Sequence, residues 1–163
     1  MRGLLLLTVF GGGFGQTTVV PALRIGDVAP DLPLIVVVLL ALRRGPEMGC
    51  LAGFAMGLLQ DAAGGGLIGV QALTKGLAGF LVGALAGNLR GTQPLIQVPG
   101  LALLTIVEGV ARFGLLKLFH FPAPFGELML YVVLPQALYN GFLGAALLLA
   151  LEGASLYRRR QVS

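Results

Sequence analysis

The feature that most constrains this chain is a run of glycines four residues apart, Gly45, Gly49, Gly53 and Gly57, which Asp61 continues at the same spacing. Residues four apart lie on one face of an α-helix, so the run predicts a helix with a stripe almost free of side chains that ends in a carboxylate. In water, each glycine inside a helix costs roughly 0.5–1 kcal/mol relative to alanine. In lipid, the backbone has no water to bond, and small residues let two helices approach closely. The stripe therefore favours a membrane helix that packs closely against another helix.

Composition supports a membrane class for the whole chain. Of its 163 residues, 56% are hydrophobic and 11% are charged, whereas soluble domains carry about 25% charged residues. We therefore predict an all-α membrane protein with one polytopic domain over residues 1–163. The net charge of +4 comes from scattered basic residues, so we expect no nucleic-acid partner. The single Cys50 allows no internal disulfide and no cysteine-based zinc site.

Hydropathy predicts a bundle of six transmembrane helices. A secretory signal peptide is the alternative for the first apolar segment, but no A-x-A-like cleavage site follows it. The second and third segments are short for a hydrocarbon core that needs about 20 residues. The predicted spans are residues 4–20, 32–42, 48–60, 67–89, 95–119 and 128–151.

The distribution of basic residues predicts the orientation of these spans. Six spans put both termini on one side of the membrane, and cytoplasmic loops carry an excess of lysine and arginine. With the termini inside, seven arginines are cytoplasmic and two basic loop residues are outside. We therefore expect a multi-pass protein of the bacterial inner membrane with both termini in the cytoplasm. The cytoplasmic set is Arg2, Arg43, Arg44, Arg90, Arg158, Arg159 and Arg160, and the outer set is Arg24 and Lys117.

A second stripe at the same spacing lies on the predicted fourth span, where Lys75 is followed by Gly79, Gly83 and Gly87. The simpler interpretation is that it packs against the third span within the chain. The alternative is that one glycine face, in particular that of the third span, binds a partner's helix. Both stripes are therefore candidates for helix packing or partner contact.

Charged side chains inside predicted spans form a third candidate feature. A charge in a span is costly and usually faces the bundle with a partner. Arg112 lies one helical turn after Glu108, so the two can pair along one helix, and Glu108 can also reach Lys75 across helices. We expect a buried charge cluster of Lys75, Glu108 and Arg112. A structural ion cluster, a partner contact and a ligand or proton pathway all stay open as its role.

The sixth span carries a polar stripe formed by Gln136 and Asn140, with Gly144 one turn further along. Amide side chains inside membrane bundles usually form hydrogen bonds between helices. We expect that role here in preference to a ligand contact.

No set of residues predicts catalysis or a cofactor. The only histidine, His120, has no second histidine or cysteine for a metal site. Gly64, Gly66 and Gly69 spell G-x-G-x-x-G, but a dinucleotide site needs a preceding strand and a βαβ unit. We expect a flexible hairpin there, no cofactor and no enzyme activity.

Several segments together resemble the rod shape-determining protein MreD family, and the resemblance covers essentially the whole chain. The central GLLQDAAGGGLIG run and the Tyr-Asn pair are its more specific parts. The resembling segments are PDL at 30–32, ALRRGP at 41–46, GF at 53–54, GLLQD at 57–61, GGGLIG at 64–69 and LPQALYN at 134–140.

The resemblance implies a non-enzymatic adaptor of the bacterial cell-elongation machinery. It implies direct binding of MreC and a place in a wider complex with MreB, RodZ, RodA and a class B penicillin-binding protein. The expected role is to help regulate lateral peptidoglycan synthesis and rod shape, in contact with membrane lipid.

The same resemblance supplies a rival function. The MreD family is similar in architecture to the substrate-binding subunits of energy-coupling-factor vitamin transporters, which commonly dock through an A-x-x-x-A pattern in the first helix. Here only Gly11 and Gly15 have that spacing, and the loops hold few polar groups for a vitamin. The adaptor is therefore the preferred prediction.

Overall fold

The computed structural model describes residue 11 and residues 28–64, 67–89, 94–122 and 124–161. Every regular element in these ranges is helical, which confirms the prediction of an all-α protein for this part of the chain. The predicted span at 4–20 lies outside the described ranges. The elements are α2 (Leu32–Arg44), α3 (Pro46–Gly64), α4 (Val70–Leu89), α5 (Pro94–Leu118), α6 (Phe125–Glu127), a π-helical segment η2 (Leu128–Val133) and α7 (Leu134–Gln161).

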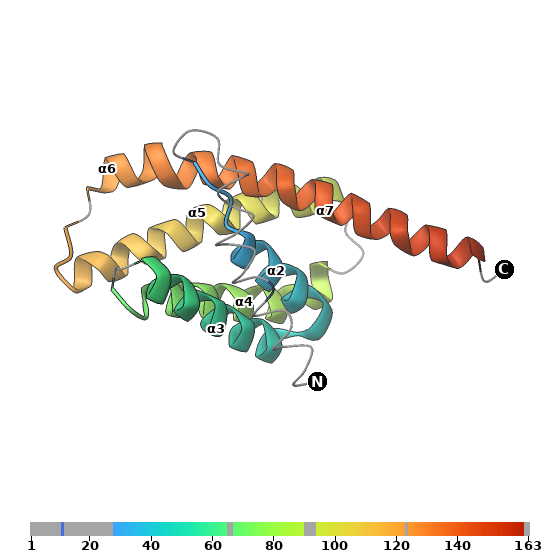
Figure 1. The fold of residues 1–163 in the computed structure, drawn as a ribbon, viewed down its shortest axis with the longest axis horizontal. Helices are drawn as coiled ribbons and strands as arrows, with labels where there is room; N and C mark the ends of the chain where they lie inside the picture. Colours follow the sequence, from blue (N-terminus) through green and yellow to red (C-terminus); the bar gives the residue numbers. More distant parts are fainter. Residues whose placement is uncertain (1–10, 12–27, 65–66, 90–93, 123, 162–163) are drawn as a thin grey trace.

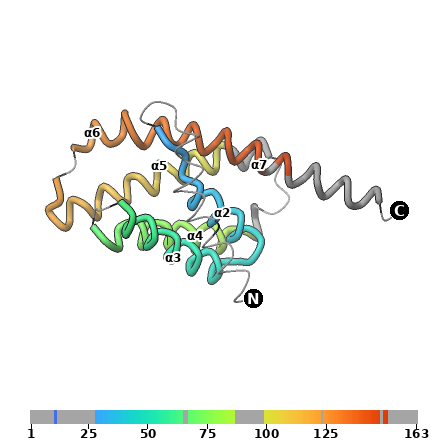
Figure 2. The backbone as a smooth tube through the Cα atoms, viewed as in Figure 1, coloured from blue at the N-terminus to red at the C-terminus, as the bar shows by residue number. Residues whose placement is uncertain are grey.

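The helices form two pairs joined by α2. Helix α3 packs along α4, and α5 packs along α7 (Figure 1). Helix α2 packs against both α3 and α4 and lies between this hairpin and the α5–α7 pair (Figure 2). Its contact with α3 includes a small apolar core, formed by Val37, Leu40, Ala52 and Met56.

Local sequence signals fix both ends of α2. Asp31 caps the N-terminus, because its Oδ1 accepts a hydrogen bond from the Leu34 amide at 3.1 Å. Pro33 lies in the first turn, where a proline removes no helical hydrogen bond. Gly45 ends the helix with φ at +90°, a conformation that favours glycine. Gly45 is therefore the residue between α2 and α3, and its carbonyl accepts the Gly49 amide at 3.1 Å, which places it directly before the first turn of α3 in line with the stripe.

The remaining glycines of the α3 stripe pack against the backbone of α4. A methyl group at Gly49, Gly53 or Gly57 would overlap backbone atoms of Gly79, Lys75 or Gln71, respectively. Close backbone approach of this kind is what small residues permit in membrane helices. The α3 stripe is thus covered by α4 of the same chain, so the hypothesis that it binds a partner's helix is wrong.

The α4 stripe forms the other half of this contact. Gly79 faces Gly49, and Gly83 faces Gly45 and Pro46 at the start of α3. Gly87 is in α4, but its surroundings lie outside the described residues. The two stripes therefore act as one packing surface, as the simpler interpretation of the α4 stripe predicts.

A π-helical turn, η2, precedes Pro135 near the start of α7. The Leu134 amide donates to the Met129 carbonyl, five residues back, because the chain is wound more widely here. On the opposing helix, a methyl group at Gly109 would lie 2.6 Å from Val133 Cγ1. The π-turn therefore sets buried Val133 against α5 at a point where only glycine fits.

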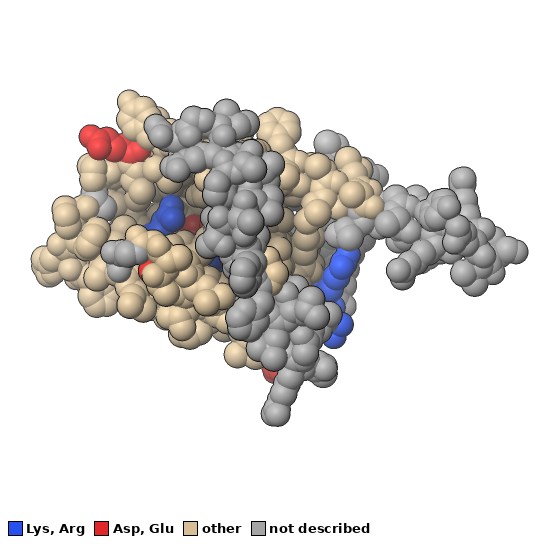
Figure 3. All heavy atoms as spheres, in the orientation of Figure 1, with Lys and Arg blue, Asp and Glu red and all other residues tan. Residues whose placement is uncertain are grey.

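The described surface is apolar over long stretches. Large apolar side chains are exposed on α3 and α4, among them Leu51, Phe54, Leu73, Leu77 and Phe80. In the face shown in Figure 3, basic and acidic atoms of the described residues appear at the rim and together in one hollow. Among the described residues one segment, Phe125–Leu147, is long and apolar enough to cross a membrane, and the apolar part of α4, Val70–Ala86, is shorter.

Candidate functional site

The centre of the candidate site is Lys75, whose side chain is fully buried inside the bundle. Its ammonium Nζ lies 2.8 Å from Asp31 Oδ2 and 3.3 Å from Glu108 Oε1. It also donates to Gln71 Oε1, one turn back on α4, at 3.1 Å. One cation thus joins two carboxylates from different parts of the chain, and we call Asp31, Lys75 and Glu108 the ion triad.

Asp31 reaches the triad because it is the cap of α2. Its Oδ1 accepts from the Leu34 amide and from Gln60 Nε2 of α3, which leaves Oδ2 for Lys75. Its own backbone amide donates to Asn140 Oδ1 of α7 at 2.8 Å. Sequence reasoning did not single out Asp31 and so missed its place in the site. The signal that points to it is the helix-start pattern of an aspartate two residues before a proline.

Glu108 joins α5 to α4 through one oxygen. Its Oε1 accepts from Thr74 Oγ1 at 2.9 Å and from Lys75 at 3.3 Å. Thr74 is itself buried, and the Val70 carbonyl, 3.0 Å from its Oγ1, is an alternative acceptor for its single hydroxyl proton. Thr74 and Lys75, neighbours on α4, therefore bind the same carboxylate of α5, and Glu108 links the two helices.

The polar stripe of α7 extends this network. Asn140 is fully buried, and its Nδ2 donates to Thr105 Oγ1 of α5 at 3.2 Å while its Oδ1 accepts from Asp31. Gln136 Nε2 donates to the Ala29 carbonyl, just before α2, at 3.1 Å. Both amides thus bond to other segments of the chain, the role that the sequence favours for them.

Arg112 is close to the ion triad in sequence but is not part of it. No ion pair joins Arg112 to Glu108 in the described part of the chain, where the carboxylate binds Lys75 instead. Its Nε and Nη2 atoms are buried without a hydrogen-bond partner. Of the two pairings that the sequence leaves open for Glu108, the structure shows the one with Lys75.

Asp61 has a separate role at the turn between α3 and α4. Its carboxylate accepts hydrogen bonds from the amides of Gly69, Gln71 and Ala72 at 2.8, 3.1 and 3.2 Å. The amides of Gln71 and Ala72 belong to the first turn of α4, which has no partners for them within the helix, and Gly69 directly precedes that turn. Gly69 adopts φ at +103°, which lets the turn bring them to the carboxylate. The Asp-x-x-Gly-Gly-Gly-x-x-Gly pattern therefore forms a helix cap.

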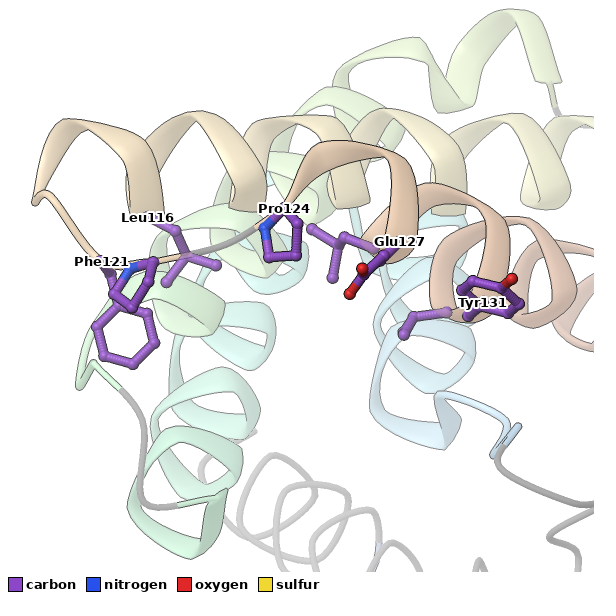
Figure 4. A pocket seen from close by; sticks show the side chains of 8 residues that line it. Leu116, Phe121, Pro124, Glu127 and Tyr131 are labelled. Carbon is purple, nitrogen blue, oxygen red and sulfur yellow. The ribbon is translucent and has the colours of Figure 1, made fainter.

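A pocket of about 430 Å³ lies apart from the triad, at the end of α5. It is lined mainly by apolar side chains, and Leu116, Phe121, Pro124, Glu127 and Tyr131 point to one side of the α5–α6 connection (Figure 4). Glu127 is the charged group in this lining. The described residues contain no group of His, Cys, Asp and Glu side chains that is arranged to hold a metal ion.

Chemically, the triad and its amide neighbours can stabilise a fixed helix arrangement. A buried charge is costly unless it is paired and hydrogen-bonded, and each charge of the triad has such partners here. Together with the apolar surface, this network in the described residues is consistent with an all-α membrane protein whose helices are held together by polar groups inside the bundle.

The family follows from a comparison with protein-family models. The model described as rod shape-determining protein MreD matches residues 1–159. The chain therefore belongs to the MreD family, which supports a role in rod shape determination and in the shape-determining complex. No curated protein and no solved structure matches the chain. The family match does not support the alternative of a vitamin-transporter subunit.

Proposed function

We propose that this protein is a non-enzymatic, multi-pass adaptor in the bacterial inner membrane that binds MreC. It crosses the membrane six times, with both termini in the cytoplasm, and needs no cofactor. Through MreC it acts with MreB, RodZ, RodA and a class B penicillin-binding protein to regulate lateral peptidoglycan synthesis. The observation that carries this proposal is the family match over nearly the entire chain.

The buried network supports a binding function in preference to turnover. The segments that resemble the family supply its members: Asp31 comes from the 30–32 segment, Gln60 and Asp61 from 57–61, and Gln136 and Asn140 from 134–140. All of them bond to groups of the same chain. A fixed bundle of this kind presents a constant outer surface to a partner.

The position of the glycine stripes narrows the search for the MreC contact. Gly49, Gly53 and Gly57 are covered by α4, and Gly79 and Gly83 are covered by α3 and the turn before it. The contact is therefore expected on the outward faces of the helices, away from these stripes.

Capture in mild detergent tests the proposal. The tagged full chain is co-expressed with MreC and purified, and MreC is expected to co-purify in a fixed ratio. A matched control is an unrelated polytopic protein with the same tag at the same expression level. Recovery of MreC at the level of this control, from a folded chain, would overturn the proposed binding.

A further inference from the structure

Arg112 carries the strongest unexplained feature of the described chain. Its Nε and Nη2 atoms are buried and have no hydrogen-bond partner. These two nitrogens form one edge of the guanidinium, which can donate two parallel hydrogen bonds to a carboxylate or a phosphate. A buried donor without a partner costs free energy, and more so when it is charged. An anion that binds this edge would remove that cost.

The carboxylates of the described chain are engaged elsewhere or lie at other places. Asp31 and Glu108 bind Lys75, and Asp61 caps α4. Glu47 is exposed in the first turn of α3, and Glu127 is exposed on α6. No ion pair of Arg112 with any of them occurs in the described ranges. The anion is therefore expected to come from outside this part of the chain.

The depth of Arg112 in the membrane indicates which anion is available. Helix α5 has 25 residues, a length of about 37 Å, against a hydrocarbon core of about 30 Å. Arg112 lies six residues before the end of α5 at Leu118, about 9 Å along the axis. In the proposed membrane arrangement its Cα is thus only a few ångströms below the headgroup region.

Aromatic side chains mark the same end of the bundle as an interface. Phe119, Phe121 and Tyr131 are exposed there, and Phe113 packs on Phe125 with ring centroids 4.8 Å apart. Tyrosine and tryptophan are enriched at the level of the lipid headgroups, and Tyr131 is the residue of this kind here. The phosphate of a lipid is the anion present at that level.

We propose that Arg112 binds the phosphate group of an anionic lipid through its Nε and Nη2 edge. The inference rests on the membrane embedding proposed above. Arginine suits this ligand because its planar fork matches phosphate geometry, which a lysine ammonium does not. The bound lipid would neutralise the guanidinium next to the ion triad without using either of its carboxylates.

The test measures lipid binding by the purified full chain. Tagged protein in a neutral detergent is titrated with phosphatidylglycerol, with zwitterionic phosphatidylcholine or with inorganic phosphate, and its melting temperature is recorded. The wild type is expected to gain stability with phosphatidylglycerol and little with the other two. Arg112→Gln should weaken phosphatidylglycerol binding at least about tenfold, because a charge-assisted hydrogen bond is worth that factor or more.

Two further variants make the result decisive. Arg112→Lys keeps the charge but loses the two-nitrogen edge. It is therefore expected to bind phosphatidylglycerol more weakly than the wild type. If Arg112→Gln does not fold, this variant replaces it in the test. Lys117→Gln removes an exposed charge of the same helix and should leave phosphatidylglycerol binding unchanged.

Equal phosphatidylglycerol binding by the wild type and Arg112→Lys, or no stabilisation of the wild type by this lipid, would overturn the proposal. If inorganic phosphate raises the melting temperature of the wild type as much as phosphatidylglycerol does, the ligand is not a lipid. Loss of MreC capture with lipid binding intact would contradict the proposed function alone.

Discussion

Lys75 Nζ lies 2.8 Å from Asp31 Oδ2, so the second turn of α4 is joined to the residue that caps α2. The same ammonium reaches Glu108 of α5 at 3.3 Å. The amide of Asp31 in turn bonds to Asn140 of α7. Four helices therefore depend on one buried cation and its neighbours.

Removal of Lys75 should be strongly destabilising. Lys75→Met leaves the carboxylates of Asp31 and Glu108 buried without their cation, and the loss of one partner of a buried pair costs about 3–5 kcal/mol. We expect a low folded yield and a lower melting temperature in detergent. The double variant Lys75→Met with Glu108→Gln should recover part of the loss, because one stranded charge is gone. An unchanged melting temperature for Lys75→Met would contradict the buried triad.

Substitution of Gly53 should prevent the α3–α4 contact. A methyl group there would overlap the backbone carbonyl of Lys75, and a backbone atom cannot move aside as a flexible side chain can. Gly53→Ala is therefore expected to reduce the folded monomer in size-exclusion chromatography. Gly64→Ala in the same helix is the matched control, because no atom lies within 4 Å of its added carbon. Equal monomer yields for the two variants would refute the close contact.

Loss of the Asp61 carboxylate should weaken the start of α4. Replacement of a helix cap by alanine typically costs about 1 kcal/mol, and Asp61 accepts from three amides. We expect Asp61→Ala to lower the melting temperature clearly and Asp61→Asn to lower it less, since the amide keeps one acceptor. Glu47→Gln, at an exposed position of α3, should change it by about 0.5 kcal/mol or less. A larger effect at Glu47 than at Asp61 would be inconsistent with the cap.

The proposed orientation predicts the activity of phosphatase fusions. A periplasmic phosphatase fused after Ser163 should be inactive, because the basic tail is expected in the cytoplasm. A fusion within the 122–126 connection should be active. Protein levels measured by immunoblot control for unstable fusions. The reverse pattern of activity would exclude the six-span arrangement.

The periodic patterns of the sequence predicted which faces of α3 and α4 take part in close packing, but not which helix covers each face. Spacing by four identified the faces of α3 and α4 that meet, because helical periodicity fixes which residues share a face. It could not identify what covers a face, since a partner's helix and a helix of the same chain need the same small residues. The choice in favour of α4 required the three-dimensional contact of Gly53 with the Lys75 carbonyl.

Asp31 shows what a one-dimensional pattern omits. The sequence places it before a helix, as a polar residue of a connection. Its burial follows from the path of the chain, which brings the start of α2 next to the second turn of α4 and to Asn140. Contacts between residues so distant in sequence leave no periodic signal. Arg112 illustrates the converse, because its spacing from Glu108 permits a pair that the structure does not form.

The arrangement of the ion triad has a consequence for biosynthesis. A lysine inside a membrane helix costs up to about 2.5–3.5 kcal/mol to insert into a bilayer. In the proposed six-span arrangement, the ribosome makes Asp31 before Lys75, so the counter-ion of Lys75 would already be present when α4 enters the membrane. Glu108 and then Asn140 arrive later and add to a pair that is already neutral. In that arrangement, the order of these residues along the chain would let α2, α3 and α4 assemble in lipid before α5 and α7 are synthesised.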